Sequence, residues 1–106
     1  MIGVVVSKNG CRIRLTNERW NHIVKSHREL ENMVKRVLKV VSAPDLIIKG
    51  RRDELIAASK KNRKYLVVIY KESKPTGFIV TAFVTSKIEQ IKKRGVIWQK
   101  KRSGKL

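Results

Sequence analysis

Two histidines, His22 and His27, are the residues best suited to proton transfer, and both lie in the segment TNERWNHIVKSH (16–27). An imidazole gains and loses a proton close to neutral pH, so either could act as a general acid or base. On a helix with about 100° per residue, His27 shares the apolar stripe of Trp20 and Ile23, and His22 points about 140° away. We expect His27 to be held in place by packing and His22 to be exposed to solvent or substrate. A buried structural histidine fits the position of His27 equally well.

Two hydroxyls follow in the strand-like segment GFIVTAFVT (77–85). Alternation places Thr81 and Thr85 on one face with Ile79 and Phe83. The opposite face is wholly apolar and is the predicted seat of the helices: Phe78, Val80, Ala82 and Val84. The threonine-bearing face is then the one open to a ligand, although threonines that only support a strand are common.

Positive charge dominates the composition, with 26 Lys and Arg against 8 Asp and Glu and a formal net charge of +18. Such an excess favours a polyanionic partner. It is densest near the C-terminus, at Lys87, Lys92, Lys93, Arg94, Lys100, Lys101, Arg102 and Lys105. A merely solvated surface is the alternative, but solubility needs a net charge of only about 2–8. An anionic membrane surface is a poorer fit because the segment has little apolar face.

The length of 106 residues predicts a single domain. The one cysteine, Cys11, cannot form an internal disulfide, which favours a reducing cytoplasm. No apolar run approaches the roughly 18–20 residues of a membrane span, and the N-terminal MIGVVV lacks a preceding basic segment, so we expect neither a span nor a signal peptide. Two histidines and one cysteine at unrelated spacings do not predict a zinc site.

Periodicity and turn residues predict the elements that position these groups. A hairpin with an Asn-Gly turn is expected over 2–15, a helix capped by Thr16 over 17–28 and a second helix over 30–41. Strands are expected at 45–50, 54–59, 64–70 and 77–85, then a short helix within 86–95 and an apolar plug or edge strand at 96–99. The predicted fold class is α+β, with an N-terminal β-hairpin, two helices packed on a four-stranded antiparallel sheet and a short C-terminal helix. Residues 1–106 form the single domain, with a basic tail at about 100–106.

Four stretches together resemble a known group of nucleases: IRLTNERWNHIVKSHREL, SAPDLIIKG, YLVVIYK and GFIVTAFVT. They are similar to the phage- and mobile-element-associated families of the barnase–EndoU–colicin–RelE-like (BECR) fold. The resemblance covers about residues 12–86, and its most specific part is the T-x-x-R-W-x-H-I start. It implies metal-independent ribonuclease activity without a cofactor, with catalytic weight on His22, His27 and Thr81. Many relatives carry proline straight after the second histidine, where this chain has Arg28.

Cleavage of RNA without a metal needs a base for the 2′-hydroxyl proton, an acid for the leaving 5′-oxygen and cations for the phosphate. A histidine can supply the first two, and a threonine hydroxyl can orient a phosphoryl oxygen. The predicted contacts to RNA or phosphate are Arg19, Arg51, Arg52, Lys71, Thr85, Lys92, Lys93, Arg94 and Trp98. Trp20 and Phe78 are expected in the core.

Three functions remain open at this point. The first is a small endoribonuclease, such as the toxin of a toxin–antitoxin pair whose acidic antitoxin masks the basic surface. The second is a non-catalytic RNA- or DNA-binding protein on the same scaffold, and the third is a domesticated ribosome-associated factor. The sequence does not select among tRNA, mRNA and rRNA.

Overall fold

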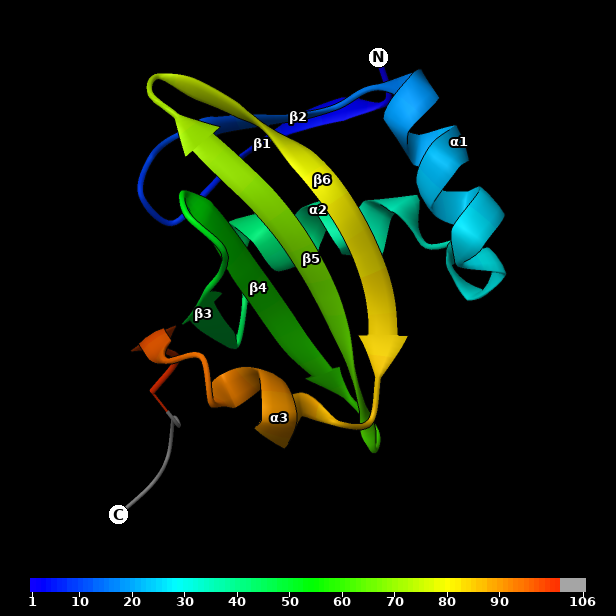
Figure 1. Cartoon of the computed structure of the whole chain (residues 1–106). Helices are drawn as coiled ribbons and strands as arrows, with labels where there is room; N and C mark the ends of the chain where they lie inside the picture. The colour runs from blue at the N-terminus through cyan, green and yellow to red at the C-terminus, as the bar shows by residue number, and fades with distance from the viewer. Residues whose placement is uncertain (102–106) are drawn as a thin grey trace.

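A computed structural model describes residues 1–101 and shows one sheet of seven strands (Figure 1). The strands are β1 (Gly3–Val6), β2 (Arg12–Leu15), β3 (Leu46–Lys49), β4 (Glu54–Lys61), β5 (Lys64–Ser73), β6 (Thr76–Thr85) and β7 (Val96–Gln99). The helices are α1 (Asn17–Ser26), a 3-10 turn η1 (Arg28–Leu30), α2 (Val34–Ser42) and α3 (Ile88–Lys92). Of the predicted basic tail, residues 102–106 lie outside the described residues.

The predicted four-stranded antiparallel sheet carrying two helices is wrong. The strand order is β1-β2-β6-β5-β4-β3-β7, and residues 1–101 contain three α-helices. β2 joins the sheet by pairing parallel with β6, and β7 extends it by pairing antiparallel with β3. Both pairings connect segments far apart in the sequence, so the local alternation that located the strands did not reveal them.

The helices form close to their expected positions. The Thr16 hydroxyl accepts a hydrogen bond from the Arg19 backbone N–H at 3.1 Å and begins α1, which ends where the His27 N–H donates to Ile23. The second helix begins later than expected, at Val34. Leu30, the expected first residue of its apolar stripe, instead lies buried in η1.

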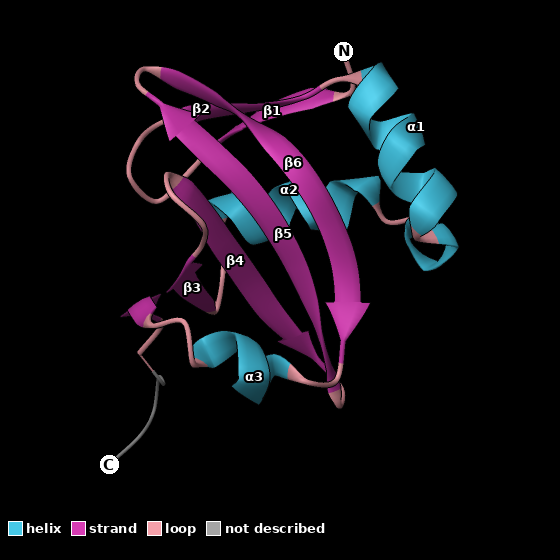
Figure 2. Ribbon diagram, in the orientation of Figure 1, coloured by secondary structure: helices cyan, strands magenta, loops and turns pink. Residues whose placement is uncertain are grey.

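The sheet has two different faces. α1 and α2 cover one of them, the helix face, and Figure 2 shows α2 behind the central strands. On the other side α3 covers only one end, where Ile88 and Ile91 pack against β3, β4 and β5. Beyond α3 lies the open face, defined by side chains that the strand registers place on the same side: Val4, Val6, Arg12, Arg14, Lys71, Thr76, Phe78 and Thr81.

A bulge in β6 changes which of its side chains reach the open face. The register passes from Tyr70↔Ile79 directly to Ile69↔Thr81, so Val80 has no partner in β5. The extra residue turns Ile79 to the helix face, where it is buried, and Phe78 to the open face. The expectation that Ile79 shares a face with Thr81 and that Phe78 lies in the core is therefore wrong.

The two ends of the sheet also approach each other in space. Lys8, in the turn between β1 and β2, places its ammonium 4.6 Å from the centre of the Trp98 ring in β7. The contact is a cation–π interaction. Because β1 and β7 are the two outermost strands, the contact shows that the sheet is strongly curled.

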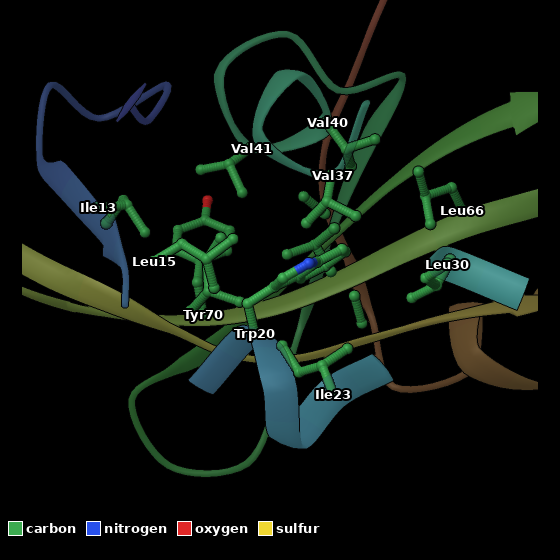
Figure 3. Packing of buried hydrophobic residues seen from close by; sticks show 14 of the residues in the cluster. Ile13, Leu15, Trp20, Ile23, Leu30, Val37, Val40, Val41, Leu66 and Tyr70 are labelled. Carbon is green, nitrogen blue, oxygen red and sulfur yellow. The ribbon is translucent and has the colours of Figure 1, made fainter. Parts of the chain in front are cut away.

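Tyr70 is a polar residue in an otherwise apolar core. Its ring is fully buried among Ile13, Leu15 and Val41 (Figure 3), and within residues 1–101 its hydroxyl has no hydrogen-bond partner. Burial, with the Glu72 carboxylate nearby, raises the pKa of Tyr70. The hydroxyl therefore stays neutral in the folded protein at any ordinary pH.

We expect Tyr70→Phe to raise the free energy of unfolding by about 1 kcal/mol, because it removes a buried hydroxyl without a partner. The gain should widen above pH 10. The unfolded phenol ionises around its ordinary pKa of 10.0 while the folded one does not, so the parent loses stability as pH rises past that value. Urea unfolding at pH 7 and pH 10.5 measures both effects. A variant less stable than the parent at pH 7 would mean that the hydroxyl is satisfied.

Candidate active site on the open face of the sheet

His27 caps the C-terminal end of α1 and lies next to Phe83 of β6, and Figure 1 shows α1 alongside β6. Its ring centre is 6.1 Å from that of Phe83, with the ring planes tilted by 36°. The side chain is 34% exposed, and Nδ1 lies 3.7 Å from the Glu29 carboxylate. Contact with Phe83 limits the motion of the imidazole, and Glu29 engages one of its nitrogens. The other nitrogen, Nε2, takes no part in the contact with Glu29.

The edge of β6 next to His27 is not covered by a second strand in the part of the chain that the structure describes. Within the described residues, β2 pairs with β6 only from Thr76 to Phe78, so the later part of β6 has a strand neighbour on one side only. Thr81 is half-buried on the same face as Phe83, two positions along, which is about 7 Å. The Thr81 hydroxyl and the His27 imidazole therefore flank one stretch of the open face.

A row of side chains crosses the open face farther along β6, about 16 Å from Phe83. Arg14, Phe78 and Lys71 are consecutive register partners on β2, β6 and β5, about 5 Å apart from strand to strand. Phe78 is 39% exposed, and Arg14 is exposed beside it. An accessible aromatic ring between two cations can stack a base and bind the phosphates on either side of it.

The predicted cations of the β3–β4 turn lie at the end of the same row. Lys71 is 3.8 Å from the Asp53 carboxylate, and Arg51 and Arg52 precede Asp53 in the turn. Arg52 has a φ of 53°, the left-handed conformation, and is exposed. Asp53 offsets part of the charge of Lys71, so Arg14 is the cation of the row that is less neutralised.

His22 and Arg19 lie elsewhere. Both line a shallow depression of about 630 Å³ on the outer side of α1, together with Thr16 and Lys25. His27 is not part of it. The structure thus separates the two histidines, as the helical wheel predicted, and brings only His27 to the open face.

Most of the remaining predicted contacts have structural partners. The Thr85 hydroxyl accepts a hydrogen bond from the Lys87 N–H at 3.0 Å, Lys92 lies 3.4 Å from Glu89, and Arg94 donates through Nε to the Lys49 carbonyl at 3.2 Å. Lys8 covers Trp98, and Lys93 is exposed. Of these groups, Thr85 lies two positions beyond Phe83 on the same face, as far from Phe83 along the strand as Thr81.

Sequence reasoning missed Arg14 and Phe78. The alternation in CRIRL already places Arg12 and Arg14 on one face of a strand, and that signal could have identified Arg14. Phe78 had no such signal, because its exposure depends on the bulge at Val80.

Within residues 1–101, no three His, Cys, Asp or Glu side chains gather closely enough to hold a metal ion. In the same range, none of the helices has the length and apolar character needed to cross a bilayer. Comparison of the chain with models of protein families, with curated proteins and with solved structures gave no match in any of the three.

Proposed function

We propose that the protein is a small, metal-independent endoribonuclease that binds RNA across the open face and cleaves it through a 2′,3′-cyclic phosphate. The observation that carries the proposal is that His27, beside Phe83, and Thr81 lie along the strand whose other end carries Phe78 in the row Arg14–Phe78–Lys71, about 16 Å from Phe83. The row supplies base stacking and phosphate contacts, and His27 supplies a proton-transfer group. The resemblance to BECR nucleases agrees with this assignment, and membership of that group is part of the proposal.

In the proposed reaction a base away from the bond to be cut stacks on Phe78, and Arg14 and Lys71 bind the phosphates that flank that base. His27 takes the proton of the 2′-hydroxyl through Nε2, and the 2′-oxygen attacks phosphorus. The bond from phosphorus to the 5′-oxygen breaks, and the leaving oxygen takes a proton from water, because His22 lies on another side of α1. The Thr81 hydroxyl donates to a phosphoryl oxygen as negative charge develops.

The net charge of +18 favours a partner that is acidic, which agrees with an antitoxin protein that masks the surface between encounters with RNA. We therefore propose that the protein acts as a toxin in the cytoplasm. The second candidate is a non-catalytic RNA- or DNA-binding protein. The exposed Arg12 and Arg14 support a binding protein as well as they support a nuclease, since phosphate contacts alone need no histidine.

The decisive experiment is incubation of the purified protein with total RNA in EDTA. We expect internal cleavage, with new 3′ ends that carry a 2′,3′-cyclic phosphate, detected by resistance of these ends to alkaline phosphatase until acid opens the cyclic ester. RNA from several sources, including tRNA, mRNA and rRNA, should be compared. If none is cut while salt-sensitive binding remains, the binding-protein function replaces the nuclease.

A further inference from the structure

A second basic site lies between α2 and the turn that joins β4 to β5. This hairpin cavity has a volume of about 430 Å³. Its floor is apolar, formed by Met33, Leu66 and Val84. Its rim is cationic, formed by Arg36, Lys61, Arg63 and Lys64. Ligand sites of this kind combine an apolar base with a few polar groups that fix orientation.

The hairpin cavity is separate from the candidate active site. Leu66 and Val84 point to the helix face and pack against its core, whereas Thr81 lies on the opposite side of the sheet. Only an RNA that passes around the edge of the sheet could reach both places.

The cations of the rim are not neutralised. Within residues 1–101, none of the four lies within 4.0 Å of a carboxylate. An adjoining depression of about 330 Å³ shares Arg36 and Lys61 with the cavity and adds Lys39, Lys60 and Lys100. Its only carboxylate, Asp45, already accepts a hydrogen bond from the Lys60 N–H at 2.8 Å. Charge complementarity at this place therefore favours an anionic ligand.

We infer that the hairpin cavity binds one unpaired nucleotide of a single-stranded RNA, with the base on the apolar floor and the adjacent phosphates on the rim. A nucleotide joins a flat, largely apolar group to an anion, which matches the floor and the rim. An acidic helical peptide would need several apolar anchors at three- and four-residue steps, and the cavity offers a single apolar floor. The choice of RNA as ligand rests on the proposed function. The hairpin cavity would add a contact with RNA outside the open face that carries the candidate active site.

The test uses a short, fluorescent, 2′-O-methylated RNA, which cannot be cleaved, and measures affinity at several salt concentrations. Val84→Phe fills the floor and keeps every charge, so we expect affinity to fall at least about fivefold with an unchanged salt slope. Lys61→Ala removes a rim cation and should reduce the slope by about 0.7. Lys35→Ala is the matched control, because Lys35 is an exposed cation of α2 outside the cavity, and it should change the slope less.

A folded Val84→Phe protein with parent affinity would overturn the inference, and Met33→Phe provides the same test if Val84→Phe does not fold. Tighter binding of a Glu/Leu-rich helical peptide than of RNA, lost in the filled variant, would overturn it in favour of a protein partner. A free nucleoside monophosphate that binds as tightly as the RNA would also overturn it. Because the methylated RNA is not cut, these results hold whether or not the protein is a nuclease.

Discussion

His27→Ala is expected to slow RNA cleavage by about 10²–10⁴-fold, the usual contribution of a general acid or base, with RNA affinity nearly unchanged. The substitution removes the proton-transfer group at the edge of β6 but leaves the cations and Phe78 in place. Single-turnover cleavage in a gel assay measures the rate, and binding of 2′-O-methylated RNA measures the affinity.

Two kinds of control separate catalysis from structure. His27→Gln retains volume beside Phe83 and should be equally slow, and a melting curve should accompany both variants because alanine here can cost about 1–3 kcal/mol of stability. Phe78→Ala should do the reverse, weakening binding with less effect on the rate at saturation. His22→Ala should slow cleavage far less than His27→Ala, because His22 lies on another side of α1. Folded His27 variants that cut RNA at the parent rate would make His27 a structural residue.

Gly77→Ala is expected to destabilise the fold by about 3 kcal/mol or more, lowering the melting temperature by more than about 10 °C. Gly77 lies where β2 meets β6, paired with Ile13. A methyl group there would fall on the Lys71 carbonyl oxygen and within 2.9 Å of Ile13 Cδ1. Backbone on one side and a buried side chain on the other leave no space for it.

Gly3→Ala is the matched control for Gly77→Ala. Its added methyl would meet Leu38 Cδ1 at 2.9 Å, the end of a flexible side chain that can move aside. We expect a change within about 1 kcal/mol, since alanine also restricts the unfolded chain. Thermal unfolding followed by circular dichroism compares the two variants. Equal melting temperatures for Gly77→Ala and the parent would mean that β2 does not pack on β6 as described.

Local patterns located the elements but not the sheet that they build. The Asn-Gly turn, the Thr16 cap and the alternating apolar residues predicted the hairpin, the first helix and four of the strands near their observed positions. Which strands become neighbours depends on contacts between distant segments. The β2–β6 and β3–β7 pairs are such contacts, so the predicted sheet has three strands fewer than the observed one.

The candidate site was only partly predictable for the same reason. Helical geometry separated His22 from His27, and alternation placed Thr81 with Phe83. The bulge at Val80 leaves no mark in an unbroken apolar run, so Phe78 was assigned to the core. Individual basic residues could not be ranked from the sequence, because Arg94 and Lys92 look no different from Arg14 until their partners are known.

The parallel pairing of β2 with β6 affects how soon during synthesis the proposed RNA-binding surface can form. More than half of the chain lies between Ile13 and Gly77, so the N-terminal hairpin emerges from the ribosome well before the strand that it must join. At roughly 5–20 residues per second, that interval lasts several seconds. Arg14 meets Phe78 only after β6 has been made, and closing so long a loop carries an entropic cost that the meander of β3 to β6 does not. The surface proposed to bind RNA is therefore incomplete until β6 has paired with β2, and a nascent chain in which β6 has not yet been made does not have it, although the ribosome around it is rich in RNA.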